Sequence, residues 1–187
     1  NMQALAELLS SEHGKVIADS HGDLQRGLEV IEFACGIPHL LKGEYTEGAG
    51  PGIDVFSMRQ PIGVAAGITP FNFPAMIPMW MFGPAIACGN AFILKPSEKD
   101  PGVPLRLAEL MLEAGAPEGV VNVVTNAPED APEIVETLIA HPAVRRINFT
   151  GSTRVGRIIA KLGAEHLKPV LLELGGKAPF LVLDDAD

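Results

Sequence analysis

Cysteine, aromatic residues and positive charge are all scarce in this chain of 187 residues. Its two cysteines, Cys35 and Cys88, form no CxxC pair and have no histidine at ligand spacing, which argues against a disulfide framework and a zinc site. We expect both to be ordinary buried thiols in a reducing cytoplasm. The net charge of −9 comes without a basic stripe, so nucleic acids and anionic membranes are not expected partners.

A targeting leader and long apolar runs are also missing. No charged and then apolar segment opens the chain, and prolines interrupt the longest apolar candidate, residues 73–88, which is shorter than the roughly 18 residues of a membrane span. The start at Asn1-Met2-Gln3 looks truncated, and Asp184-Asp185-Ala186-Asp187 looks like the entry to a further helix. We therefore expect a fragment of a longer protein.

What the chain has in quantity is short apolar segments. Their periodicity predicts helices at 2–12, 24–35, 74–88, 104–114, 132–140 and 155–162, and strands at 63–68, 91–94, 120–124, 146–149, 170–174 and 180–183. Short buried strands that alternate with helices indicate an α/β fold, a Rossmann-like parallel sheet with helices on both faces. The glycine-rich stretch 43–53 predicts a loop or hairpin tip, and 54–60 a following edge strand.

Ligands of such sheets gather at the carboxyl ends of the strands, where four segments stand out. In the first, Thr69-Pro70-Phe71-Asn72-Phe73-Pro74, two prolines bracket Asn72 and would hold its amide rigidly, as the stabilisation of an oxyanion requires. The alternative is that Asn72 caps the helix that follows.

The second segment, Lys95-Pro96-Ser97-Glu98, can bind a ribose between Lys95 and Glu98. A carboxylate there would accept from free ribose hydroxyls and repel a 2′-phosphate, which favours NAD over NADP. A solvated turn with an ordinary charge pair is the alternative.

The third segment leads from a strand through Phe149-Thr150-Gly151-Ser152 into a helix, whose unpaired amides and dipole favour a phosphate. Its glycine spacing is that of a Walker A loop, but Arg157-Ile158 stand where Lys and Ser or Thr would, so phosphoryl transfer is excluded. A plain helix start capped by Ser152 or Thr153 is the alternative.

The fourth segment places Glu173 between an apolar strand and Gly175-Gly176. Apolar neighbours would raise the pKa of this carboxyl towards the range of a general base, and the glycines allow close approach of a ligand. The alternative is a strand-end pair with Lys177. Elsewhere, the cluster Met76, Met79, Trp80 and Met81 is expected to be core packing, and the five scattered histidines to be structural.

In this order and spacing the motifs resemble the aldehyde dehydrogenase superfamily over essentially the whole chain. Residues 40–111 are similar to methylmalonate-semialdehyde dehydrogenases, and residues 120–187 to salicylaldehyde and vanillin dehydrogenases. The segments that carry the resemblance are Pro61-Ile62-Gly63-Val64, 69–74, Gly83-Pro84-Ala85, Gly89-Asn90, 95–98, 115–122, 149–152 and Leu172-Glu173-Leu174-Gly175-Gly176-Lys177.

The resemblance implies a domain plan and a site. Residues 1–42 would be N-terminal helices, 43–60 a hairpin or linker of the oligomerisation region of a homodimer or homotetramer, and 61–187 the NAD-binding domain. Asn72 would supply the oxyanion-hole amide and Glu173 the general base for a small aldehyde substrate. NAD would be held by Thr69, Pro70, Phe71, Lys95, Ser97, Glu98, Gly151, Ser152, Leu174 and Gly175.

The family's reaction begins with a cysteine thiolate that attacks the aldehyde, roughly thirty residues beyond the Glu-Leu-Gly-Gly-Lys segment. The chain ends fourteen residues after Glu173, at Asp187, and neither Cys35 nor Cys88 stands in a Gly-Gln-x-Cys context. We therefore expect the catalytic domain to be absent from this chain and the fragment to be inactive alone. Because Glu173 is present, water is the expected acyl acceptor; a coenzyme A-acylating semialdehyde dehydrogenase and an inactive NAD-binding module are the alternatives.

Overall fold

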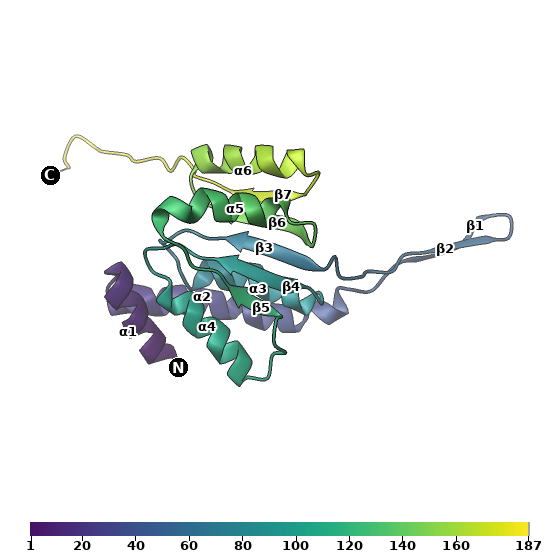
Figure 1. Cartoon of the computed structure of the whole chain (residues 1–187), viewed down its shortest axis with the longest axis horizontal. Helices are drawn as coiled ribbons and strands as arrows, with labels where there is room; N and C mark the ends of the chain where they lie inside the picture. Colours follow the sequence, from purple (N-terminus) through teal and green to yellow (C-terminus); the bar gives the residue numbers. More distant parts are fainter. Residues whose placement is uncertain (187) are drawn as a thin grey trace.

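A five-stranded parallel sheet lies at the centre of the protein, in a computed structural model that describes residues 1–186 (Figure 1). Helices α1 to α4 cover one face of the sheet, and α5 and α6 cover the other. In spatial order the strands are β5 (Val121–Val123), β4 (Ala91–Lys95), β3 (Val64–Ile68), β6 (Val144–Thr150) and β7 (Val170–Glu173). The helices are α1 (Met2–His13), α2 (Ile17–Cys35), α3 (Met76–Ala87), α4 (Gly102–Glu113), α5 (Ala131–Ala140) and α6 (Thr153–Glu165), with 3₁₀ turns η1 (Ile37–His39) and η2 (Pro128–Asp130).

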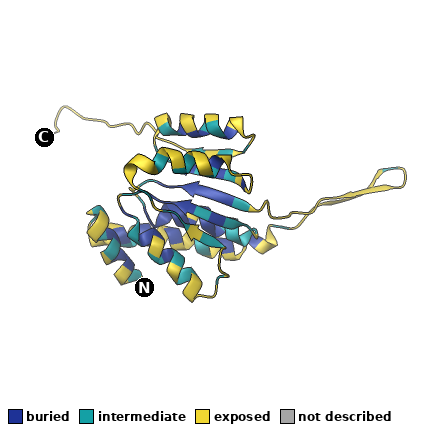
Figure 2. Cartoon of the chain, in the orientation of Figure 1, coloured by how far each residue is buried: buried dark blue, intermediate teal, exposed yellow. Residues whose placement is uncertain are grey.

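Small residues in β3 let both helical layers approach the middle of the sheet. Ala65 packs into the core beneath α1 to α4, whereas Ala66 and Ile68 pack into the core beneath α5 and α6, because neighbouring strand residues point to opposite faces. A Cβ added at Gly67 would lie 2.5 Å from Cζ of Phe92, so this position admits no larger side chain without movement. Figure 2 shows that burial is concentrated in the sheet and the inner helix faces.

The strand order contains a reversal that determines where a ligand can bind. From β3 the chain runs through α3, β4 and α4 to β5 on one side, then returns over the other face through α5 to β6 and α6 to β7. The reversal leaves β3 and β6 side by side although they are far apart in sequence. Doubly wound sheets bind their ligands outside the carboxyl ends of the strands at such a point. The predicted fold class, a Rossmann-like parallel sheet covered on both faces, is confirmed.

The glycine-rich segment forms an antiparallel hairpin of β1 (Tyr45–Gly50) and β2 (Ile53–Phe56). It projects from the body at the amino edge of the sheet, opposite the edge where the strands end (Figure 1). Residues 43–53 are therefore a hairpin, as the sequence suggested, and the predicted edge strand at 54–60 is shorter and begins at Ile53.

Two sequence predictions are wrong. The apolar run 180–183 forms no strand among the described residues; it extends away from the body, with Phe180 90% exposed. A strand needs a paired neighbour and a covered face, and this run has neither here. The cysteines are not buried thiols: Cys35, at the end of α2, is exposed, and Cys88, just after α3, is half-buried.

Candidate functional site

The four predicted strand ends lie in one row at the carboxyl edge of the sheet. The strand register pairs Ile68 with both Lys95 and Phe149, and Thr150 with Glu173. Backbone hydrogen bonds continue the row beyond the strands: Thr69 N donates to Lys95 O (3.1 Å), and Gly151 N donates to Glu173 O (3.0 Å). Segments about 80 residues apart in sequence, at Ile68 and Phe149, are thus held as neighbours across the β3–β6 switch point.

The start of α6 has the geometry of an anion site. Ser152 is its N-cap, in an extended conformation, and its Oγ accepts from Val155 N (3.3 Å), so the capping alternative is realised. The next two amides, of Thr153 and Arg154, have no protein acceptor among the described residues, and the helix dipole is directed at the same place. A Cβ at Gly151 would lie 2.6 Å from Cζ of Phe149, so a larger residue there would have to displace the Phe149 ring or the turn.

The end of β4 is not the solvated turn that the sequence left open. Lys95 is only 4% exposed, and its Nζ donates to Pro96 O (2.8 Å). Burial lowers the pKa of Lys95, and the negative charge of Glu98 partly opposes this shift. Ser97 is buried and its Oγ accepts from Lys99 N (3.1 Å), which shapes the loop, while the half-buried Glu98 carboxylate has no hydrogen-bond donor among the described residues.

The loop after β3 leaves Asn72 exposed. Helix α3 begins at Met76 with Ala75 as its cap residue, so the alternative that Asn72 caps this helix is wrong. The first amide of α3 instead donates to Oδ1 of Asp23 on α2, at 2.7 Å. Thr69, at the start of the loop, is buried, and its Oγ1 has no hydrogen-bond partner in residues 1–186.

A cleft of about 470 Å³ separates α3 from the ends of β6 and β7, and Glu173 lies on its wall. Glu173 is exposed, so the apolar enclosure predicted for this carboxylate is not found in the described part of the chain, and no ion pair with Lys177 is found there either. Trp80 lines the same cleft and is 45% exposed. The core-packing prediction is thus wrong for Trp80; the methionines that flank it in the sequence are buried, as expected.

Leu174 and Gly175 follow β7 beside the start of α6. Both are exposed, and the Leu174 side chain packs where a Cβ on Gly156 would lie, 2.6 Å from Leu174 Cδ2. The glycine in the first turn of α6 therefore brings the residue after Glu173 close to the anion site. Pro70 and Phe71 stand at the β3 end of the same row, half-buried and exposed respectively.

Sequence reasoning missed a group of charged residues behind the Asn72 loop. Asp23 is buried and forms an ion pair with Lys15 (Nζ to Oδ2, 3.2 Å). Asp100 is 2% exposed, and neither of its carboxylate oxygens is hydrogen-bonded to a residue that the structure describes. Burial together with the nearby charge of Glu12 raises its pKa to about 7. A signal for Asp23 was present in the sequence, because Ser20, Asp23 and Gly27 share the spacing of one helix face.

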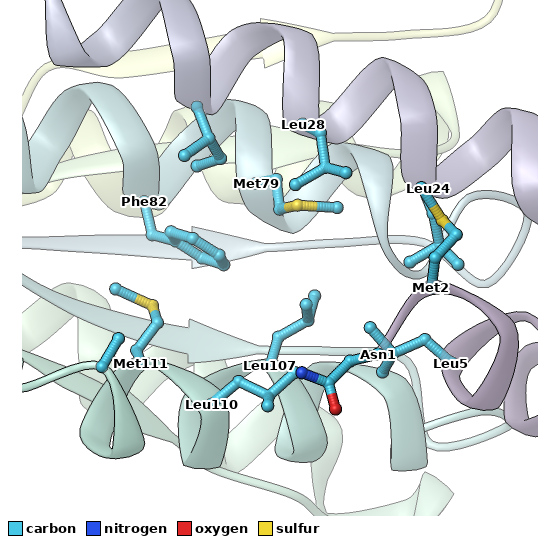
Figure 3. Close-up of a pocket in the computed structure, with 12 residues that line it drawn as sticks. Asn1, Met2, Leu5, Leu24, Leu28, Met79, Phe82, Leu107, Leu110 and Met111 are labelled. Atoms are coloured by element: carbon cyan, nitrogen blue, oxygen red, sulfur yellow. The ribbon is translucent and has the colours of Figure 1, made fainter.

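A second cavity lies away from this edge. It has a volume of about 460 Å³ and apolar walls from the inner sides of α1 to α4, with Met79, Phe82 and Leu107 among its lining residues (Figure 3). None of the predicted site residues lines it. Within residues 1–186, no three His, Cys, Asp or Glu side chains are grouped as metal ligands, and no helix has the length and apolarity of a bilayer crossing.

Comparison with known proteins settles the family. Residues 1–187 match the model of the aldehyde dehydrogenase family. The chain belongs to that family. It is 50% identical over 187 residues to a malonate-semialdehyde dehydrogenase of Pseudomonas aeruginosa and 49% identical over 189 residues to the acylating mitochondrial methylmalonate-semialdehyde dehydrogenase of Arabidopsis thaliana. In each case the whole chain aligns, but it spans only 37% and 30% of the relatives' lengths.

A solved structure has the same fold. The crystal structure of a Sinorhizobium meliloti protein assigned as a methylmalonate-semialdehyde dehydrogenase, complexed with NAD, superposes with a TM-score of 0.90 at 59% identity. It covers 95% of this chain, which matches 35% of that protein. The predicted resemblance to the superfamily is confirmed, and the similarity to semialdehyde dehydrogenases extends beyond 40–111 through the second half of the chain.

Proposed function

We propose that this aldehyde dehydrogenase chain is the NAD-binding part of an enzyme that oxidises a small, carboxylate-bearing aldehyde to the acid. One observation carries the proposal: the Asn72 loop, the Lys95–Glu98 loop, the start of α6 and Glu173 meet at one edge of the sheet, across its switch point. That is where doubly wound folds bind dinucleotides.

The residues at this edge fit NAD. The two unpaired amides at the start of α6, next to Gly151, suit a pyrophosphate, and the absence of a Cβ at Gly151 leaves the backbone approachable. The unpaired carboxylate of Glu98, near buried Lys95, suits the hydroxyls of a ribose. NAD, when bound, would accept the hydride of the oxidation.

Asn72 and Glu173 would act on the aldehyde. The Asn72 side chain is exposed and uncommitted to the helix cap, so it is free to donate to a developing oxyanion. Glu173, on the wall of the cleft, would take a proton from water during release of the acid. Neither cysteine suits the role of nucleophile, because Cys88 follows the C-terminal end of α3, near the amino edge where β4 begins, and Cys35 ends α2. We therefore assign the nucleophile to sequence outside residues 1–187.

Arg26 is our candidate for the substrate carboxylate. It is exposed on α2, forms no ion pair with a carboxylate among the described residues, and lines with Phe73 a pocket of about 360 Å³ that Asp19 and Asp23 also line. Its carbonyl accepts from Trp80 Nε1 at 3.2 Å, and Trp80 lines the cleft that contains Glu173. An exposed guanidinium on α2 suits a semialdehyde with a terminal carboxylate, the substrate type in the relatives' names.

Water is the acceptor we favour because a carboxylate is present at Glu173. Transfer to coenzyme A is the second candidate, since the relative from Arabidopsis thaliana is named as acylating. Quantifying free acid and acyl-CoA formed by the full-length protein in the presence of coenzyme A decides between them. Predominant acyl-CoA would contradict the role given to Glu173.

The hairpin favours assembly of a homodimer or homotetramer. It exposes Tyr45, Ile53, Val55 and Phe56 on two short strands whose outer edges are unpaired among the described residues. Sedimentation of the chain with and without Phe56→Ser tests this assignment. The free thiols of Cys35 and Cys88 fit a cytoplasmic location.

Titration of the 187-residue chain with NAD, followed by calorimetry, tests the proposed function. We expect Glu98→Ala to weaken binding about 10- to 100-fold, because it removes charge-assisted hydrogen bonds to the ribose. Glu129→Ala, at an exposed position in η2, is the matched control and should leave the affinity unchanged. Equal affinity in the Glu98 variant and the unmodified chain would refute the proposed cofactor site.

A further inference from the structure

Two lysines stand over the two rings that flank Asn72. Lys15 Nζ lies 4.1 Å from the ring centroid of Phe73, and Lys99 Nζ lies 4.2 Å from that of Phe71. Ammonium groups at such distances are attracted by the negative ring face. The exposed Asn72 therefore sits between two side chains that are each covered by a cation, and the two cations come from different parts of the chain.

Lys15 is itself held in place. Its Nζ forms an ion pair with Asp23 Oδ2 at 3.2 Å, and the side chains of Lys15 and Asp23 are 12% and 0% exposed. The other oxygen of Asp23, Oδ1, accepts from Met76 N, the first amide of α3, at 2.7 Å. One buried carboxylate thus joins the turn between α1 and α2 to the start of the helix that follows the Asn72 loop.

This arrangement restrains the side of the loop that follows Asn72. Asp23 determines where α3 begins, three residues after Phe73, and the same carboxylate orients the ammonium that lies on the Phe73 ring. No hydrogen bond of the Asn72 side chain to another described residue holds the amide directly. The orientation of Asn72 therefore depends on its neighbours, Phe71 and Phe73.

We propose that Lys15, oriented by Asp23, is a positioning residue that holds Asn72 in its working orientation through the ring of Phe73. The proposal rests on the proposed role of Asn72 as oxyanion donor. Lys15 itself touches no reacting atom; it restricts the loop so that the amide does not have to be ordered during the reaction.

Backbone order parameters from ¹⁵N relaxation of the 187-residue chain test this proposal. Phe71, Asn72 and Phe73 should give values near 0.85 in the unmodified chain and below about 0.6 in Lys15→Met, which keeps the length of the side chain but removes its charge. Lys15→Arg keeps a cation for both Asp23 and the ring and should restore the values. Lys161→Met, at an exposed position on α6, is the matched control and should leave the loop unchanged.

A second variant separates the restraint of the Asn72 loop by Lys15 from the stability of the buried ion pair. Phe73→Leu removes the ring but keeps Lys15 and Asp23 paired, and it should loosen the loop as Lys15→Met does. If Lys15→Met lowers the melting temperature but leaves the order parameters of the loop unchanged, Lys15 has a purely structural role and the proposal is overturned. Unchanged order parameters in Phe73→Leu would overturn it as well, even if Lys15→Met fails to fold.

The NAD titration tests the proposed function separately from the loop measurement. Failure of the unmodified chain to bind NAD would remove the proposed cofactor site but leave the loop measurement intact. Conversely, normal NAD binding together with loop order parameters that do not change in Lys15→Met would support the cofactor site and contradict the positioning role of Lys15.

Discussion

Replacing Asp100 by Asn should raise the free energy of unfolding relative to that of the unmodified chain as the pH goes from acidic to neutral. Asp100 is buried, its two carboxylate oxygens have no hydrogen bonds within the described part of the chain, and its pKa is raised from 3.8 to about 7. Burial is the largest cause, followed by the negative charge of Glu12; the positive charge of Lys15 opposes them. The folded protein therefore holds a proton on Asp100 at pH values where the unfolded chain has lost it.

The sign and the size follow from proton linkage. A group whose pKa is higher in the folded state contributes its full stability below the unfolded pKa, here 3.8, and loses it as pH rises through about 7. The slope is about 1.4 kcal/mol per pH unit, so up to roughly 4 kcal/mol is lost between pH 4 and 7. Asn at position 100 does not titrate, so the variant does not lose this free energy of unfolding as the pH rises.

Urea unfolding at pH 5, 6, 7 and 8 measures the difference in free energy of unfolding between Asp100→Asn and the unmodified chain. The difference should shift in favour of the variant by about 1.4 kcal/mol for each pH unit up to about 7 and then level off. Asp185→Asn, at an exposed position, is the control and should show no such trend. A difference that stays constant from pH 5 to 8 would refute the reasoning, because it would mean that Asp100 is ionised in the fold throughout.

Three further predictions address the site. Gly151→Ala should weaken NAD binding at least tenfold in a calorimetric titration, because its Cβ would lie 2.6 Å from the Phe149 ring and displace the turn at the proposed pyrophosphate site; unchanged affinity would move that site elsewhere. Asp23→Asn should lower the free energy of unfolding by about 3–5 kcal/mol in urea titrations, since it breaks a buried ion pair, whereas the exposed Asp19→Asn should cost less than about 1 kcal/mol. In the full-length protein, Glu173→Gln should reduce release of free acid about 10²- to 10⁴-fold, measured by product analysis, while a normal rate would assign the base to another group.

The switch point shows why much of the site could be predicted. Strand ends can be recognised in the sequence, because apolar runs stop at Thr69, Lys95, Gly151 and Glu173. Parallel strands place all such ends at one edge of the sheet. The chemistry of the turn residues then limits the class of ligand that this edge suits. The neighbour relation between β3 and β6 depends on how the crossovers wind, and the right-handed rule for parallel crossovers constrains it without a structure.

The errors have a common physical origin. Trp80 and the run 180–183 are apolar, and a sequence pattern assigns apolar residues to the core, but burial depends on what other segments cover them. The expected enclosure of Glu173 fails for the same reason. The alternative that Asn72 caps α3 looked only at neighbours in the sequence, whereas the first amide of α3, Met76 N, donates to Asp23, 53 residues away.

The sequence by itself thus determined the fold class, the edge of the sheet at which the candidate site lies and the residue types presented there, because these depend on local periodicity and on turn chemistry. Only the tertiary structure decided which side chains restrain the site. The Lys15–Asp23 ion pair, the lysines over Phe71 and Phe73, and the raised pKa of Asp100 all arise from contacts between segments distant in sequence. Such contacts leave no periodic signal, because their energies depend on distance and burial rather than on spacing along the chain.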